Sequence, residues 1–560
     1  MILRKKTITE TSDKTEVCRK TKMNLKSACR HSTTLTLTQR NTALKLKLCA
    51  VIALSFLVLS SGTAQTTAPN AGQRSNQQAR AVLDAGIEAT GGLEALRSVH
   101  DFTLREIGRQ HHPYQSLSTE RPWLSGPVEE LTVVDSTRGL AFNEVKQFNP
   151  GFTFWTGTVI KGGVGFRLDF WSKTATSIPK PSLDALRTQC RRLPHFLLLE
   201  LLDQAASLRW LGQDTLRNRK QNVIAAMRPD GRLLNLYFDA QTNLLTKYDY
   251  IYEDAAVGDS LIEQSYQDYR SVGPVKVPRG RTLSSSGEVR EETNYVDVKF
   301  NASPAESLFD VPSGFEKTAE PAVSSVVGVS TLAKDVYLVQ GMNGDYNGFF
   351  IAFNDYVLVV DAPEPFPFNH FSEKLIEKIK QTVPGRPIKY LVLSHYHWDH
   401  AGGARAFMAE GTTVVTTPGN KGFLEQLARA RFTLDPDALA RNPRVPVIET
   451  IQNQKRVFRD ENHLVEFYDI GPSPHANEMI VAYLPREKIL FQADLLNPNP
   501  DGRLPTAQDR TVHFAARIQQ LGLDPEKIVG AHGRVVSRAE LAEMLEKRQR
   551  ETAPLAGEKH

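Results

Sequence analysis

Short apolar runs separated by turn residues form the dominant pattern in the middle of the chain. Alternating aromatic and β-branched positions are typical of antiparallel strands, and turns such as Arg228–Gly231 separate them. The runs with this pattern are Phe152–Trp155, Gly165–Phe170, Leu233–Phe238 and Leu244–Tyr252. Two stretches, Ala79–Leu96 and Phe196–Leu202, have helical spacing instead, and the first is interrupted at Gly91 and Gly92. The pattern predicts an antiparallel, β-rich domain over residues 80–316.

The C-terminal part mixes short strands with amphipathic helices. Apolar residues recur at helical spacing in Phe371–Lys380 and Lys421–Arg431. Strand-like apolar runs occupy Val336–Val339, Phe349–Phe353, Tyr356–Asp361, Ile388–Leu393, Thr412–Thr417 and two segments of Glu478–Leu496. This alternation predicts a layered domain of helices and strands, joined to the first domain by a linker at residues 317–325. The predicted fold class is therefore α+β, with two domains.

The N-terminal region has the features of an export signal. Leu48–Leu59 is an apolar run of twelve residues that follows Lys45 and Lys47 and precedes the small residues of Ser60–Gln65. The run is short for a membrane span, so we expect no permanent membrane anchor. Residues 1–64 are predicted to be a leader with a secretory signal peptide, cleaved near Ala64. The mature protein is then expected in the periplasm or outside the cell.

Excluding the leader changes the charge and the cysteine count. Residues 1–47 carry twelve Lys or Arg and three Asp or Glu, a net charge of +9. Subtracting +9 from the whole-chain charge of +5 leaves a net charge of −4 for the remaining residues. A nucleic-acid partner therefore loses its electrostatic support. Of the four cysteines only Cys190 lies beyond the leader region, so the mature chain is expected to contain no intramolecular disulfide.

The strongest chemical signal is the run Ser394–Gly403, which contains His395, His397, Asp399 and His400. Side chains alternate along a strand, so the first two histidines can point the same way toward one metal ion. The aspartate and the third histidine lie past the strand end, where the chain turns, and can face a second ion. Zinc favours nitrogen and oxygen ligands grouped in this way. The run predicts a metal site.

This run resembles the His-x-His-x-Asp-His signature of the metallo-β-lactamase superfamily, and the resemblance extends over residues 326–548. It implies a four-layer αββα sandwich and three further ligands, which match His475, Asp494 and His532. It also implies that Asp494 bridges two ions, the first held by His395, His397 and His475 and the second by Asp399, His400 and His532. A weaker resemblance links residues 80–316 to β half-barrels of the lipoprotein-carrier type.

The resemblance implies a hydrolase with two Zn²⁺ ions and a small-molecule substrate, and the predicted signal peptide would make it an exported enzyme. Two ions about 3.5–4 Å apart lower the pKa of a shared water, so a metal-bound hydroxide can attack an ester, thioester, lactone or amide bond. Asp399 is the candidate catalytic residue, because one of its oxygens remains free to orient the hydroxide. Arg503 and Arg510 are candidates for binding an anionic group of the substrate. His463 and His513 lack a motif and are expected to be structural or at the surface.

Two alternatives stay open at this point. An aspartate at the bridging position is more typical of the broader hydrolases than of one lactamase group, which makes β-lactam hydrolysis an alternative. A mononuclear iron sulfur dioxygenase is another, because imidazole and carboxylate serve zinc and iron alike. A non-catalytic binding protein is disfavoured, since no ligand position is lost. The sequence leaves the substrate, the oligomeric state and the role of the first domain open.

Overall fold

A computed structural model of the chain describes residues 68–149, 151–180, 183, 193–319, 328–341, 346–364, 370–498 and 502–552. The predicted leader (1–64) and Cys190 lie outside these residues. Residues 69–560 belong to one compact unit, so the division into two domains stays a prediction. Within the described ranges, every helix is too short or too polar to cross a membrane.

Residues 71–318, called the strand-rich part below, are built on one open sheet of fourteen strands. Its order is β16-β6-β5-β4-β3-β2-β1-β15-β14-β11-β10-β9-β8-β7, and all neighbours are antiparallel except β16 and β6. The predicted antiparallel strands are therefore present, while the half-barrel resemblance stays a prediction.

The strands of this sheet are β1 (Asp101–His111), β2 (Ser125–Asp135), β3 (Leu140–Asn149), β4 (Phe152–Lys161), β5 (Val164–Asp169), β6 (Thr174–Ile178), β7 (Arg209–Leu216), β8 (Arg219–Met227), β9 (Leu233–Asp239), β10 (Leu245–Asp254), β11 (Gly258–Gln267), β14 (Gly280–Ser285), β15 (Glu288–Phe300) and β16 (Glu316–Thr318). A separate small hairpin joins β12 (Arg270–Val272) to β13 (Val275–Val277). Two short 3-10 turns occupy Ala205–Ser207 and Glu306–Phe309.

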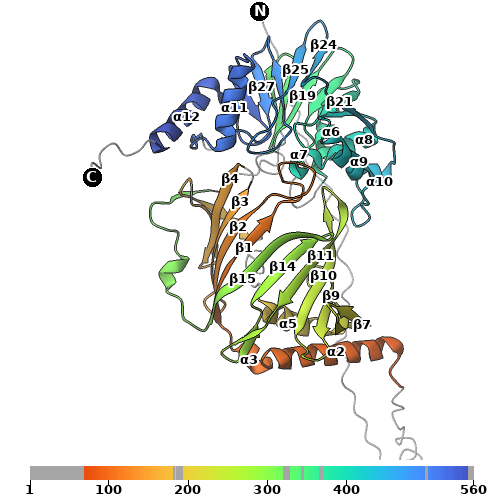
Figure 1. The fold of residues 1–560 in the computed structure, drawn as a ribbon, viewed down its shortest axis with the longest axis vertical. Coiled ribbons are helices and arrows are strands. Elements are labelled where there is room, and N and C mark those ends of the chain that lie inside the picture. The colour runs from red at the N-terminus through yellow and green to blue at the C-terminus, as the bar shows by residue number, and fades with distance from the viewer. Residues whose placement is uncertain are drawn as a thin grey trace, which may run out of the picture. The chain divides into compact units, whose positions relative to one another are not determined.

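Among the described residues of this part, three helices pack on the sheet, as Figure 1 shows for α2 and α5. They are α2 (Ala71–Thr90), α3 (Leu93–Arg97) and α5 (Pro194–Asp203). Apolar residues of α2 and α5, such as Leu83 and Leu198, share one buried cluster with the strands. The predicted break between α2 and α3 is present: Gly91 has φ 142°, and a Cβ there would lie 2.4 Å from the Pro274 carbonyl oxygen. Only glycine fits this position.

Buried His195 in α5 should make the strand-rich part sensitive to acid. Its side chain is 1% exposed, packs on Phe196 and Phe300, and makes no hydrogen bond in the described part of the chain. Burial lowers the pKa of His195 to about 3. The unfolded histidine takes up a proton near pH 6.5 and the folded one does not, so stability is lost as the pH falls below 6.5.

We expect His195 to cost about 2 kcal/mol of unfolding free energy between pH 7 and pH 5. His195→Leu should remove that part of the acid loss, as measured by urea denaturation at the two pH values. His100→Gln, a histidine replacement at an exposed position of the same part, is the matched control. An equal acid loss in His195→Leu and the parent protein would contradict the prediction.

The start of the predicted linker lies in a strand. Lys317 and Thr318 belong to β16 and pair with Ala175 and Thr176 of β6, so the segment 317–325 begins inside a strand, and its role as a linker stays a prediction. The backbone hydrogen bonds of the sheet edge hold these residues as a strand, which their polar side chains do not signal. Residues 320–325 lie outside the described residues.

From residue 328 onward the chain forms two sheets. The seven-stranded sheet has the order β17-β18-β19-β20-β21-β22-β23 and turns from antiparallel to parallel at β20 and β21. The six-stranded sheet runs from β24 to β29, with a parallel pair at β27 and β28. The strands are β17 (Gly328–Ala333), β18 (Val336–Gln340), β19 (Gly348–Ala352), β20 (Val357–Val360), β21 (Ile388–Val392), β22 (Thr413–Thr416), β23 (Val447–Thr450), β24 (Lys455–Arg459), β25 (Leu464–Asp469), β26 (Ile480–Leu484), β27 (Ile489–Gln492), β28 (Lys527–Gly530) and β29 (Val536–Ser537).

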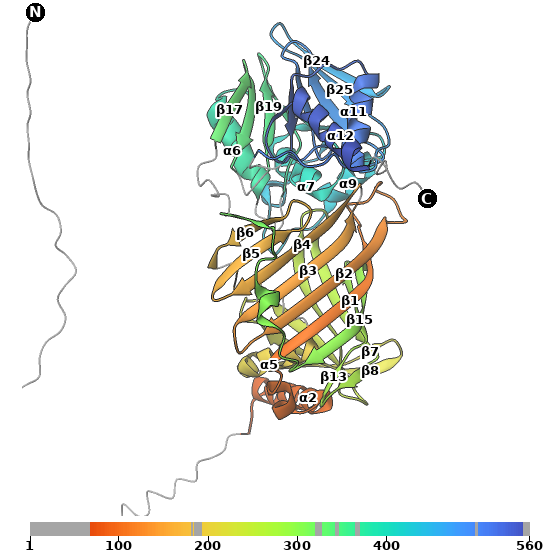
Figure 2. The ribbon, with the colours of Figure 1, turned by 90° about the vertical axis from the view of Figure 1, so that its left-hand side faces the viewer.

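Helices cover the outer faces of the two sheets (Figures 1 and 2). They are α6 (Phe371–Thr382), α7 (Trp398–Ala401), α8 (Ala404–Glu410), α9 (Lys421–Arg429) and α10 (Ala438–Arg441) on the first sheet, and α11 (Asp509–Gln520) and α12 (Arg538–Thr552) on the second. In β19, Phe349 and Ile351 pack toward the second sheet while Phe350 and Ala352 pack toward the helices. This alternation explains why β19 is apolar at every position.

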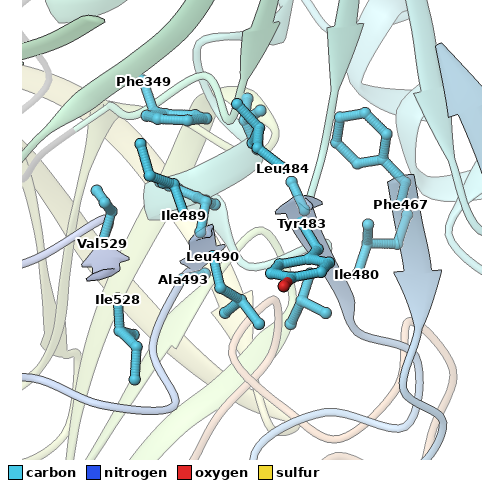
Figure 3. Packing of buried hydrophobic residues seen from close by; sticks show 14 of the residues in the cluster. Phe349, Phe467, Ile480, Tyr483, Leu484, Ile489, Leu490, Ala493, Ile528 and Val529 are labelled. Atoms are coloured by element: carbon cyan, nitrogen blue, oxygen red, sulfur yellow. The ribbon is translucent and has the colours of Figure 1, made fainter. Parts of the chain in front are cut away.

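The cluster between the sheets is the main core of this part. Figure 3 shows Phe349 of the first sheet facing residues of β26 and β27, including Leu484 and Ile489. The order of layers is helix, sheet, sheet, helix, which is the layering expected from the resemblance.

Candidate metal centre

The predicted ligands all follow the ends of strands. His395 and His397 come directly after β21, and Asp399 and His400 lie in the single turn of α7. The remaining three are His475 between β25 and β26, Asp494 after β27 and His532 after β28. Loops after parallel strands meet at one edge of a sheet, so the fold brings distant parts of the sequence together there.

The structure places the seven residues, called the ligand cluster below, in two overlapping groups. The first contains His395, His397, His475 and Asp494, and the second contains Asp399, His400, Asp494 and His532. Within each group, one ligand atom from every residue lies within 4.8 Å of the others. Asp494 belongs to both groups through different oxygens: Oδ2 lies 3.0 Å from His475 Nε2, and Oδ1 lies 3.1 Å from His400 Nε2.

The spacing of these atoms fits a metal ion. Tetrahedral zinc, with bonds of roughly 2.0–2.2 Å, places its ligand atoms about 3.3 Å from one another. His395 Nε2 and His475 Nε2 lie 3.3 Å apart, and Asp494 Oδ1 lies 3.2 Å from His532 Nε2. Asp399 Oδ2 lies farther away, at 3.5 Å from His400 Nε2 and 3.7 Å from His532 Nε2. A small movement of the Asp399 side chain would bring this oxygen to the spacing of zinc ligands.

Two hydrogen-bond chains orient the imidazoles with a lone pair toward the cluster. Asp361, directly after β20, accepts hydrogen bonds from the Ser394 hydroxyl at 2.9 Å and from His400 Nδ1 at 3.0 Å. Since the Ser394 hydroxyl donates to Asp361, its oxygen accepts from His395 Nδ1 at 3.0 Å. Both histidines therefore carry the proton on Nδ1, which leaves Nε2 free to bind a metal.

His397 is oriented in the opposite sense. Its Nε2 donates to the Ser116 carbonyl oxygen at 2.8 Å, so the lone pair is on Nδ1. Nδ1 is buried and makes no hydrogen bond in the described part of the chain. A buried nitrogen without a partner is costly, and a metal ion would satisfy it. The donor set of the cluster thus fits metal ions.

The charges of the cluster favour a bound cation. Burial lowers the pKa of His397 to about 3, and burial together with the neighbouring histidines holds the pKa of His395 well below its usual range. Burial alone would also lower the pKa of His400, but Asp494 and Asp399 raise it to about 10. His395 and His397 are therefore favoured as neutral imidazoles, while the two carboxylates attract positive charge to the second group.

Comparison with known families agrees with this geometry. Residues 343–532 match the model of the metallo-beta-lactamase superfamily. These residues form a metallo-β-lactamase superfamily domain. No curated protein matches the chain.

Solved structures similar to this metallo-β-lactamase domain have low identity. A metallo-beta-lactamase from Pontibacter korlensis is 21% identical, with 40% of this chain and 99% of that chain covered and a TM-score of 0.29. The metallo-beta-lactamase FIM-1 from Pseudomonas aeruginosa is 20% identical, with 41% and 97% covered and a TM-score of 0.30. The sec-alkylsulfatase Pisa1 from Pseudomonas sp. is 20% identical, with 39% and 41% covered and a TM-score of 0.29. Likenesses this weak do not assign a substrate.

The two arginine candidates of the metallo-β-lactamase domain differ sharply. Arg503 forms an ion pair with Glu316 at 2.8 Å and is partly exposed, which explains it as a surface contact. Arg510 at the start of α11 is 6% exposed and stacks on Phe152 of β4 at 4.2 Å. Burial lowers the pKa of Arg510, while the charges of Asp494 and Asp399 raise it. Among the described residues no carboxylate forms an ion pair with Arg510.

The histidines without a motif lie apart from the ligand groups. His463 is buried next to the Phe353 ring, with its nearest carboxylates, on Asp335 and Glu487, at 3.9 Å. His513 lies on α11 and is not part of either group. Neither histidine belongs to a ligand group, and the structural and surface roles expected for them stay predictions.

Four residues of this site, and the hydrogen bond from Gln115 to Asp399, were not predicted from the sequence. Asp361 and Ser394 orient imidazoles, and Gln115 and Ser116 reach the cluster from the strand-rich part. The expectation that one oxygen of Asp399 is free is wrong, because Oδ1 accepts a hydrogen bond from Gln115 Nε2 at 2.6 Å. That oxygen keeps a second lone pair, so the catalytic role of Asp399 stays a prediction.

Proposed function

We propose that this chain is an exported hydrolase whose metallo-β-lactamase domain uses two zinc ions to cleave an ester, thioester, lactone or amide bond in a small molecule. The main support is the position of Asp494. Its two oxygens face two separate ligand groups, each with three further ligand atoms. A carboxylate in this position can bridge two cations.

The chain's own residues would hold and orient the reaction. Two such ions activate a water molecule and polarise the oxygen of the bond to be cleaved. Asp399 would accept a hydrogen bond from the attacking water on the second lone pair of Oδ1 and so fix its direction. His395, His397 and His400 are fully buried, so the ligands keep their orientation and bulk water is excluded from behind the site.

Arg510 supports a substrate with an anionic group. A buried guanidinium without a carboxylate partner gains the most from binding a carboxylate, phosphate or sulfate group. Among the described residues Arg510 pairs with no carboxylate, and its Nε donates to Gln508 Oε1 at 3.2 Å. Against the lowering by burial, the charges of Asp494 and Asp399 raise the pKa of Arg510, which supports a position of the guanidinium close to the ligand cluster. We therefore expect the cleaved bond and an anionic group to lie in the same small molecule.

Metal content and a substrate panel test the proposal. Protein purified without added metal should contain two zinc ions per chain, whereas one iron would instead support the sulfur dioxygenase. Chromogenic esters, thioesters, lactones and a cephalosporin should then be assayed with and without chelator. Each ester should be tested in two forms, one with a free carboxylate elsewhere in the molecule and one with that carboxylate replaced by a neutral amide. We expect chelator-sensitive turnover that favours the substrate with the free carboxylate, and a cephalosporin preference would support the lactamase alternative. Metal-free protein, or turnover that survives complete metal removal, would overturn the proposal.

Export is tested separately. If the signal peptide is cleaved near Ala64, the purified protein should begin near Gln65, which N-terminal sequencing checks.

A further inference from the structure

One segment of the strand-rich part lies directly against the metal ligands. Residues 112–124 connect β1 to β2, and we call them the β1–β2 segment. The carbonyl oxygen of Leu117 accepts a hydrogen bond from Asn477 N at 2.7 Å, two residues after His475. The carbonyl oxygen of Ser118 accepts from the Tyr396 hydroxyl at 2.6 Å. The segment therefore contacts two of the loops that carry ligands.

Two further contacts reach the ligands themselves. Ser116 O accepts from His397 Nε2 at 2.8 Å, and Gln115 Nε2 donates to Asp399 Oδ1 at 2.6 Å. The first contact fixes the tautomer of a ligand in the first group. The second holds one oxygen of a ligand in the second group, so that Oδ2 is the oxygen facing His400 and His532.

The strand-rich part holds this segment in place. Leu124 N donates to the Ser116 hydroxyl at 2.6 Å, and His112 N donates to the Leu124 carbonyl oxygen at 2.9 Å, which closes the segment on itself. Arg290 of β15 donates to the Pro113 carbonyl oxygen at 3.1 Å. Ser116 is 2% exposed. Because hydrogen bonds to the strand-rich part hold both ends of the β1–β2 segment, the segment can fix the orientation of the ligand side chains that it contacts.

We propose that the strand-rich part completes the metal centre, with Gln115 as a positioning residue for Asp399 and the Ser116 carbonyl as one for His397. This inference rests on the proposed metal site. A neutral amide suits the position, because it restrains the carboxylate without adding a charge that would oppose a cation. Without the amide, Asp399 can rotate, and the ion of the second group loses a prearranged ligand oxygen.

Cobalt titration of the purified protein after metal removal, with both the strand-rich part and the metallo-β-lactamase domain present, tests the role of Gln115. Outer contacts of this kind are worth about 10- to 100-fold in metal affinity. Gln115→Ala and Gln115→Met should therefore weaken the binding of one Co²⁺ by that factor, leave the other unchanged, and alter the visible spectrum of the weaker site. Met keeps the side-chain volume but cannot donate. Thr119→Ala is the matched control, because Thr119 contacts the Gly419 carbonyl oxygen and no ligand.

The outcomes separate this inference from the proposed function. If the parent chain binds two Co²⁺ ions and both Gln115 variants bind them with unchanged affinity and spectrum, Gln115 does not position Asp399 and the inference is wrong. If Gln115→Met behaves as the parent while Gln115→Ala does not, the side chain acts by packing, and the inference is wrong again. If the parent chain binds no metal, the proposed function itself fails.

Discussion

Asp494→Asn is expected to abolish the binding of two metal ions and to lower kcat/KM by about a thousandfold. Removing a charge that balances other buried charges costs about 3–5 kcal/mol, which corresponds to roughly 10²–10⁴-fold in a binding constant. Asp494 is 5% exposed, and each of its oxygens faces a different ligand group. An amide keeps the shape, but its nitrogen cannot act as a metal ligand. Zinc content at buffered free zinc and kcat/KM on the best substrate are the measurements.

Asp509→Asn provides the control for Asp494→Asn. Asp509 is an exposed residue of α11 that pairs with Arg548, and it belongs to neither ligand group. Its variant should keep two zinc ions and full activity, since exposed ion pairs contribute little. Asp494→Asn with two zinc ions at the parent's affinity would show that Asp494 does not bridge. Circular dichroism of Asp494→Asn checks that the variant keeps the secondary structure of the parent, so that a change in zinc content reports on the site and not on unfolding.

The sequence predicts the part of the site that is continuous in the chain. His395, His397 and Asp399 lie at a strand end and in the turn after it, so local geometry alone directs them to one place. His475 and His532 have no such local signal, and only the order of ligands in the family motif indicates them. Their positions depend on which strands are neighbours, and an apolar run does not contain that information.

The residues that the sequence did not predict also depend on which distant segments are neighbours in the fold. Asp361 follows an apolar run, as many turn residues do, and it orients His400 only because β20 pairs in parallel with β21. Gln115 lies 284 residues before Asp399, in a polar segment with no motif. Among the strands that lie outside the predicted runs is the edge strand β7, whose side chains are mostly exposed and polar and lack the apolar alternation. Contacts between distant segments decide all three.

Asp361→Asn is expected to weaken binding at the second ligand group by about 100-fold, the upper end for outer contacts of a metal site. Asp361 accepts hydrogen bonds from the Ser394 backbone N–H at 2.7 Å, the Ser394 hydroxyl and His400 Nδ1. Asparagine can keep the bond to the backbone N–H through its oxygen, but its NH₂ group faces His400 Nδ1–H as a second donor. His400 then loses the partner that fixes its tautomer. Cobalt titration and the visible spectrum measure the loss.

A structural role alone predicts a different result for Asp361. Asp361→Ala also leaves the buried Ser394 N–H without a partner, at a cost of about 1–3 kcal/mol in unfolding free energy. The asparagine variant should keep most of that stability and still bind the second ion weakly, with kcat reduced more than KM is changed. Asp355→Asn, an exposed position at the opposite end of β20, should match the parent in every measurement. Equal metal affinity in Asp361→Asn and the parent would show that Asp361 supports the fold without orienting His400.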